Sequence, residues 1–430
     1  MSNSTVRNLA QRDQAVIWHP YTQMSTAAEP LPVVRGDGAR LILEDGRSIL
    51  DMISSWWVTV HGHAHPKIAD AIGLQARTLE QVIFAGCTHP QAVELAERLL
   101  VKIGAPMTRV FFTDDGSTAV EVGLKMAWQY WQNRGENRTR IIAMEHAYHG
   151  DTFGAMSVSA RSVFTQAFNP LLFEVQSIPS PADVSEEVLF SALAEACRGD
   201  QAVAIILEPL VQGAGGMKMY SPAVLDRIVN YCQEKGVLVI FDEVMTGFYR
   251  TGKLLSAHHL QHRPDIICLS KGLTGGFLPM ALTVCSDAVY EAFLSQDSGR
   301  MLFHGHSFTG NPLGCAAANA SLSLFERPET QARIARIVAL QAKAAEFFGH
   351  NERVTNVRQT GTILAMDLVQ EGPAGYLNAS GKAIAQHMLG HGILIRPLGE
   401  VIYLMPPYVT EPEDLELVYD RLDHELRRPD

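Results

Sequence analysis

Short apolar runs alternate with longer amphipathic segments through the middle of the chain. The apolar runs are VFFT (110–113), RIIAME (140–145), AVAIILEPL (202–210), VLVIFDE (237–243) and IICLSKG (266–272). Such runs are typical of strands buried on both faces, and the segments 117–132 and 221–236 between them have helical spacing. The alternation predicts an α/β fold with a mostly parallel sheet and helices on both faces. Ligands of such sheets bind at the carboxyl ends of the strands, so the polar residues after each run are the candidates for function.

The pattern changes from residue 313 onward, where it predicts a smaller α+β domain. The expected elements are a helical stretch over 313–348, two strands in TNVRQTGTILAMDLV with a turn at Gly361, a helix near 380–391 that ends at Gly392, short strands in ILIRPLG and VIYLMPPY, and a final helix in EPEDLELVYDRLDHELRR. Near the N-terminus, LILEDGRSILDM has the pattern of a hairpin with Asp-Gly at its turn. The pattern alone does not say which domain holds this hairpin.

Composition narrows the class of protein. Hydrophobic residues make up 47% of the 430 residues and charged residues 19%, which is ordinary for a globular protein. The formal charge of −11 argues against a general nucleic-acid or anionic-membrane binder. The six cysteines are scattered without zinc-type spacing, no apolar run reaches membrane-spanning length, and the N-terminus lacks the apolar core of a signal peptide. We therefore expect a cytoplasmic protein without a metal site.

Lys271 is the first candidate for chemistry. It stands in ICLSKGLTGG, directly after an apolar run and before Gly272, Gly275 and Gly276. Burial disfavours a charged ammonium and lowers its pKa, and a desolvated amine is what Schiff-base chemistry requires. A lysine whose stem lies along a strand end while its head reaches solvent is the simpler interpretation of these ten residues alone.

Asp242 favours the Schiff-base role of Lys271 over the simpler interpretation. It follows the apolar residues of VLVIFDE and stands 29 residues before Lys271, one strand–helix crossover away. An acid one strand away from a buried lysine is the arrangement that pyridoxal phosphate needs, because the acid keeps the pyridine nitrogen protonated and the lysine bonds the cofactor. A carboxylate that only caps the following turn is the alternative for Asp242 taken by itself.

Three further strand ends carry candidate cofactor contacts. Gly116 and Ser117 begin a helix after VFFT, where free amides, the helix dipole and the Ser117 hydroxyl form an anion site, a role compatible with Ser117 as a plain N-cap. Tyr148, in HAYHGDT, offers a ring to stack on a planar cofactor, although an ordinary loop tyrosine fits the same pattern. Glu208 ends a strand, and we expect it near the phenolic side of the cofactor.

Three other motifs resemble known sites but lack an essential part. GFYRTGK (247–253) has the spacing of a nucleotide-binding P-loop, but Leu254 replaces the serine or threonine that holds magnesium. HGHAHP (61–66) has three histidines at alternate positions, but without cysteines or clustered carboxylates a turn is the better interpretation. QGAGGMK lacks the third glycine of a dinucleotide-binding fingerprint.

The order of the candidate residues resembles that of the fold-type I, class III pyridoxal-phosphate aminotransferases, over nearly the whole chain. The stretches that carry the resemblance are DEVMTGFYRTG, LSKGLTGG and GHSFTGNPLGCAAANA. It implies a seven-stranded type of central sheet, a large cofactor-binding domain over 61–325, and a small domain formed by 1–60 and 326–430. It also implies a homodimer with shared active sites at the subunit interface.

The resemblance implies a role for each candidate. For the cofactor, the implied contacts are Lys271 (covalent bond), Asp242 (pyridine nitrogen), Tyr148 (ring face), Gly116 and Ser117 (phosphate), and Ser307 of the partner subunit (phosphate). Relatives often have threonine where this chain has Ser307. For the substrates, the implied pocket contains Tyr21, Trp56, Arg250, Gly305, Arg396 and Tyr403.

The stretches IWHPYTQM, MISSWWVTVHGHAHP and ILIRPLGEVIYLMPPY resemble one branch of the class, which transfers an amino group from S-adenosylmethionine to 8-amino-7-oxononanoate in biotin synthesis. In that reading Arg396 grips a carboxylate bidentately, and Trp56 and Trp57 line the substrate's methylene chain. Some relatives use lysine as donor. The alternatives are another class III aminotransferase, acting on ornithine, 4-aminobutyrate or another ω-amine, and a cofactor-free binding protein, against which the intact Lys271 and Asp242 argue.

Overall fold

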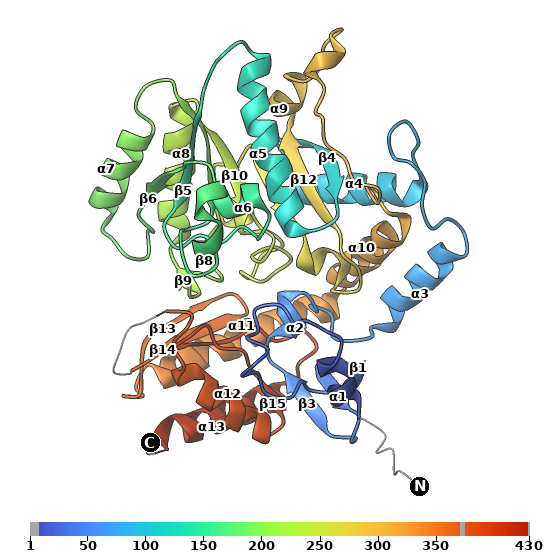
Figure 1. Ribbon diagram of the computed structural model, residues 1–430, viewed down its shortest axis with the longest axis vertical. Helices are drawn as coiled ribbons and strands as arrows, with labels where there is room; N and C mark the ends of the chain where they lie inside the picture. The colour runs from blue at the N-terminus through green and yellow to red at the C-terminus, as the bar shows by residue number, and fades with distance from the viewer. Residues whose placement is uncertain (1–7, 370–374, 429–430) are drawn as a thin grey trace.

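The computed structural model describes residues 8–369 and 375–428, which form two halves (Figure 1). A large sheet with its helices fills the upper half, and a four-stranded and a three-stranded sheet lie in the lower half, where the described residues also begin and end. Among the described residues, no helix has both the length and the apolar character needed to cross a bilayer.

Seven strands form the large sheet, and four of its six neighbouring pairs are parallel. In spatial order the strands are β4 (Met107–Thr113), β12 (Ala281–Ser286), β11 (Ile266–Leu269), β10 (Leu238–Asp242), β7 (Ala202–Leu207), β5 (Arg140–Met144) and β6 (Gln176–Ile178). Strand β12 is antiparallel to both of its neighbours. The prediction of an α/β fold with a mostly parallel central sheet is confirmed.

Helices cover both faces of this sheet, as the apolar runs predicted. Val239 and Phe241 of β10 belong to one apolar core and Ile240 to another, because successive side chains of a strand point to opposite faces. The first core includes residues of α4 (Pro90–Ile103), α7 (Glu186–Ala196) and α8 (Pro222–Glu234), and the second includes residues of α5 (Gly116–Asn133), α6 (Phe153–Val158) and α9 (Asp287–Glu291).

The lower half joins N-terminal and C-terminal strands. One sheet contains, in order, β1 (Val33–Asp37), β2 (Arg40–Leu43), β3 (Ser48–Asp51) and β15 (Ile393–Leu394), and a second contains β13 (Val354–Thr360), β14 (Ile363–Leu368) and β16 (Val401–Leu404). The predicted hairpin is present, with Gly46 at φ 86° in its turn, and β3 pairs in parallel with β15. The hairpin therefore shares a sheet with a C-terminal strand. The predicted domain boundaries at residues 60 and 325 stay predictions.

The helical stretch predicted over 313–348 is two helices, α10 (Pro312–Phe325) and α11 (Pro328–Phe348). They separate at Arg327, whose extended backbone is the conformation that a following proline favours. The other elements are α1 (Leu9–Gln14), the single turn α2 (Ser54–Trp57), α3 (Pro66–Ala76), α12 (Ser380–Gly390), α13 (Pro412–Arg427), the short strands β8 (Val211–Gln212) and β9 (Lys218–Met219), and 3-10 turns.

Glu243, directly after β10, holds the loop that follows this central strand. Its side chain is fully buried and accepts hydrogen bonds from the amides of Ser256 (2.7 Å) and Ala257 (2.8 Å). Burial raises the pKa of Glu243 to about 7, against the opposing effect of these amides.

We expect Glu243 to make the fold less stable as the pH rises from 4.5 to about 7. The folded protein binds this proton more tightly than the unfolded chain, so the stabilisation present below pH 4.5 is lost as the pH rises through the folded value. The difference between the two pKa values corresponds to on the order of 3 kcal/mol of unfolding free energy. Urea unfolding across this range should show a flatter profile for Glu243→Gln than for wild type or for the exposed control Glu186→Gln. Parallel profiles would contradict the assignment.

Candidate active site

A cavity of about 450 Å³ lies at the carboxyl edge of the seven-stranded sheet. Its lining includes six residues predicted to touch a cofactor, namely Gly116, Ser117, Tyr148, Glu208, Asp242 and Lys271. They belong to the segments at the ends of β4, β5, β7, β10 and β11. The sheet therefore brings together residues that lie far apart in the sequence.

Lys271 follows β11 and begins the 3-10 turn η3 (Lys271–Thr274) with φ 45°, a left-handed conformation that is uncommon outside glycine. Its Nζ lies 5.4 Å from the centre of the Trp57 ring. Burial lowers the pKa of Lys271, and the carboxylates of Asp242 and Glu208 oppose this effect. Because the lysine side chain also lines the cavity, a partly desolvated amine is available to a ligand there.

Asp242 is buried at the end of β10 and is hydrogen-bonded to a histidine. Its Oδ2 lies 2.7 Å from Nδ1 of His149, and its Oδ1 accepts from the amide of Val244 at 3.0 Å. A carboxylate only accepts hydrogen bonds, so His149 carries a proton on Nδ1. Among the described residues, nothing pairs with the buried Nε2 of His149. No sequence motif marks His149 for this role, although it stands beside Tyr148 in HAYHGDT.

Glu208 follows β7 and holds two loops around the cavity. One carboxylate oxygen accepts from the amide of Tyr148 at 3.0 Å and the other from the amide of Gly213 at 2.8 Å. Burial, together with the nearby charge of Asp242, raises the pKa of Glu208 to about 7 against the opposing effects of His149 and the two amides. Contact of Glu208 with the phenolic side of a cofactor stays a prediction.

The amino end of α5 forms one wall of the cavity. Its N-cap is Asp115, whose side chain accepts from the amide of Thr118 at 3.0 Å, so the simpler interpretation of Ser117 as the N-cap is wrong. The first amides of a helix lack intrahelical acceptors and point toward an anion. Gly150 packs closely against Ser117 on this wall. A Cβ at position 150 would lie 2.0 Å from Ser117 Oγ, so the packing leaves no room for a larger residue there.

Tyr148 is linked to Tyr21 through the carboxylate of Asp151, which no sequence motif marks. The Tyr148 hydroxyl donates to Asp151 at 2.9 Å and lies 3.0 Å from the Tyr21 hydroxyl, which also donates to Asp151. Burial raises the pKa of Tyr148, and burial together with Asp151 raises the pKa of Tyr21 to about 12. Both phenols are therefore held as neutral donors beside the cavity.

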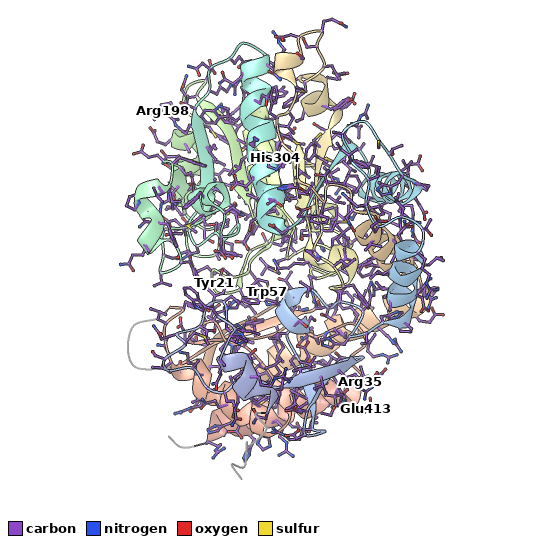
Figure 2. The ribbon with its side chains drawn as sticks, turned by 45° about the vertical axis from the view of Figure 1, so that its right-hand side comes forward. Tyr21, Arg35, Trp57, Arg198, His304 and Glu413 are labelled. Carbon is purple, nitrogen blue, oxygen red and sulfur yellow. The ribbon has the colours of Figure 1, made fainter. Side chains whose placement is uncertain are left out.

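Two more predicted substrate residues lie next to Tyr21. The Tyr21 and Trp56 ring centres are 5.6 Å apart, and the Arg396 guanidinium lies 4.9 Å from the Trp56 ring centre. Trp56 and Arg396 line a second cavity, of about 390 Å³. Figure 2 places Tyr21 and Trp57 at the level where the upper and lower halves meet.

Arg250 and Tyr403 lie beneath this surface. Arg250 is only 1% exposed and donates to the carbonyls of Pro406 (2.9 Å) and Trp57 (3.3 Å). Tyr403 is also buried, and its hydroxyl accepts from the indole of Trp57 at 2.9 Å. Arg250 and Tyr403 therefore hold Trp57 through hydrogen bonds. Direct contact of either residue with substrate stays a prediction.

Gly305 and Ser307 lie on an exposed loop outside the lining of the cofactor-sized cavity. The Ser307 carbonyl accepts from the side chain of Gln81 at 2.8 Å. A contact between Ser307 and a phosphate of the partner subunit stays a prediction.

The histidines of HGHAHP have separate surroundings. His61 lies 3.0 Å from the Ser321 hydroxyl, and His63 lies 2.9 Å from Asp51 Oδ2. Within the part of the chain that the structure describes, no three histidine, cysteine or acidic side chains form a metal-binding group.

Several known proteins that this chain resembles are aminotransferases. The family described as Aminotransferase class-III matches residues 21–426. The chain is 47% identical over 411 residues to the adenosylmethionine-8-amino-7-oxononanoate aminotransferase of Synechococcus elongatus, with 94% of this chain and 96% of that protein covered. Its fold is similar to the crystal structure of the enzyme of the same name from Methanocaldococcus jannaschii, with a TM-score of 0.93, 35% identity and coverage of 98% and 99%.

A second solved structure is an amine transaminase from an uncultivated Pseudomonas species in its pyridoxal-phosphate-bound form. It has a TM-score of 0.86 and 32% identity, and the match covers 95% of this chain and 97% of that one. The family match, the relatives and the arrangement of Lys271 and Asp242 agree, and the chain therefore belongs to the class III aminotransferases.

Proposed function

We propose that this aminotransferase transfers an amino group from S-adenosylmethionine to 8-amino-7-oxononanoate, giving 7,8-diaminononanoate for biotin synthesis, with pyridoxal 5′-phosphate as cofactor. The observation that carries the proposal is the cavity where the Lys271 amine, the Asp242–His149 pair and the amino end of α5 converge. The substrates follow from the names of the relatives from S. elongatus and M. jannaschii.

The cavity suits pyridoxal phosphate group by group. Lys271 offers an amine for the aldehyde, Asp242 an acceptor for the pyridine N–H, and the start of α5 donors for the phosphate. Tyr148 and Val244 line the space between them and offer surfaces for the ring. When bound, the cofactor supplies an electron sink for the carbanion that forms when the substrate loses a proton.

Lys271 and Asp242 have different tasks in this proposal. The lowered pKa of Lys271 allows Nζ to take the proton from the amino-bearing carbon of the donor and to deliver it again later in the cycle. Asp242 keeps a proton on the ring nitrogen, and the hydrogen bond from His149 fixes the orientation of that carboxylate. The transferred amino group replaces the keto oxygen of the acceptor, and the donor leaves as a ketone.

The substrate surface is the cluster of Tyr21, Trp56 and Arg396. Arg396 is exposed, so its guanidinium is available to grip the carboxylate of the acceptor bidentately. The faces of Tyr21 and Trp56 suit both the acceptor's hydrocarbon chain and the donor's sulfonium and adenine. Both substrates use this surface in turn, because the first product leaves before the second substrate enters.

A homodimer with shared active sites belongs to the same proposal. The loop that carries Ser307 exposes two large apolar side chains, Phe303 (61% exposed) and Phe308 (62% exposed). Exposed apolar side chains of this size suit an interface, and burying them against a second copy would bring Ser307 next to that copy.

The donor is tested by one half-reaction watched by absorbance. S-adenosylmethionine, without acceptor, should convert the pyridoxal form of the enzyme to the pyridoxamine form at sub-millimolar to millimolar concentration, a usual KM range. Conversion by lysine alone would keep the acceptor and remove the proposed donor. Rapid conversion by ornithine or 4-aminobutyrate, with no response to S-adenosylmethionine, would favour another ω-aminotransferase.

Arg396→Ala should impair the half-reaction with the acceptor far more than the half-reaction with the donor. The acceptor's carboxylate lies at the far end of its chain, and loss of its charged partner should lower kcat/KM at least about tenfold, or roughly 1.4 kcal/mol. Arg198→Ala is the matched control, because Arg198 is exposed and lies on the upper half in Figure 2. Equal damage to both half-reactions would indicate a structural role for Arg396.

Mixed dimers test the shared site. If Ser307 binds the phosphate of the partner subunit, a dimer of one Lys271→Ala and one Ser307→Ala subunit contains one doubly damaged site and one intact site. Such dimers should bind cofactor with wild-type affinity at one site, whereas Ser307→Ala homodimers should bind it weakly at both. Weak binding at every site of the mixed dimer would place Ser307 in its own subunit's site.

A further inference from the structure

The turn that carries Trp56 and Trp57 has a strained backbone. Ser54, Ser55 and Trp57 have φ values of 49°, 62° and 68°, and Trp56 between them is also non-helical. Non-glycine residues avoid this left-handed region because their Cβ crowds the backbone, so three of them within four positions need support from the surrounding structure.

That support comes from Asp51, at the end of β3. Its side chain is 0% exposed, Oδ1 accepts from the amide of Ile53 at 3.0 Å, and Oδ2 accepts from the amide of Ser55 at 2.6 Å. The same Oδ2 accepts from Nε2 of His63 at 2.9 Å. A buried carboxylate with these three donors fixes the start of the turn and satisfies its own charge.

His63 is itself held by the end of β1 and the turn that connects β1 to β2. Its amide donates to the carbonyl of Gly38 at 2.7 Å, and a Cβ on Gly36 would lie 2.5 Å from the His63 Cβ. The histidine therefore occupies a space that only glycine at position 36 leaves open. Asp51 and His63 together connect the β1–β2 segment to the turn that carries Trp56 and Trp57.

The turn presents its two indoles to different parts of the site. Trp57 lines the cofactor-sized cavity and lies 5.4 Å from Lys271 Nζ, while Trp56 lies against Tyr21 and Arg396. The dihedral angles of this short turn thus set the position of the substrate surface relative to the reacting amine. A small displacement of such a surface is enough to lower a rate.

We propose that Asp51 and His63 are positioning residues that hold the Trp56–Trp57 turn in its strained form and thereby set substrate affinity and orientation. They touch neither the cavity that suits the cofactor nor the lysine. Their loss should therefore change the response to substrates while the cofactor stays bound. This role gives the His63 of HGHAHP a function that is neither metal binding nor a simple turn.

The test compares Asp51→Asn, His63→Leu and His63→Gln in the holoenzyme. Asp51→Asn replaces one acceptor oxygen by an amide NH₂, and His63→Leu removes the donor, whereas the amide of Gln at position 63 restores a donor. The first two should raise the KM for S-adenosylmethionine at least about tenfold, with cofactor affinity within about threefold of wild type, and His63→Gln should stay near wild type. The exposed Asp37→Asn is the control.

Near-UV circular dichroism of the tryptophans gives a readout that does not depend on the donor. The near-UV signal should change in Asp51→Asn and His63→Leu but not in His63→Gln. The two His63 variants should have equal melting temperatures, so that stability does not explain the difference in signal. If wild type ignores S-adenosylmethionine, the donor proposal fails, and the KM comparison uses whichever amine converts the wild type. Equal behaviour of His63→Leu and His63→Gln, or cofactor loss in parallel with substrate affinity, would overturn the positioning role.

Discussion

The site depends on holding one amine and two carboxylates together, shielded from most of the water, at one edge of a mostly parallel sheet. Burial lowers the pKa of Lys271, and the charges of Asp242 and Glu208 oppose that effect; burial, with the charge of Asp242, raises the pKa of Glu208. Each carboxylate is satisfied separately, Asp242 by His149 and Val244, and Glu208 by two loop amides. Because neither carboxylate forms a salt bridge to Lys271 among the described contacts, the amine stays available for chemistry.

The lower half of the molecule completes this edge. The hairpin and the C-terminal strand β15 share a sheet, and β3 leads directly into the turn that carries the two tryptophans. Behind the turn, Arg250 and Tyr403 hold the carbonyl and the indole of Trp57. The small sheets therefore have a chemical role, because they carry the aromatic surface that faces the Lys271 amine.

The strand ends explain how much of the site the sequence predicts. Asp242, Lys271 and Glu208 each stand at the end of an apolar run, so their place at the sheet edge follows from the order of strands and helices. The direction of β12 does not follow, because an apolar run has the same pattern in either direction. Likewise, His149 pairs with a residue 93 positions away, and no local pattern encodes that contact. The burial of Arg250 depends on the packing of both halves, which periodicity does not describe.

Chemical trapping shows whether the Lys271 amine is the group that bonds the cofactor. The holoenzyme is reduced with borohydride, digested, and mapped by mass spectrometry, with Lys271→Ala treated in parallel. We expect the cofactor on the peptide that contains Lys271 and no labelled peptide from Lys271→Ala. A label on another lysine of the wild type, or none on Lys271 when the cofactor is bound, would contradict it.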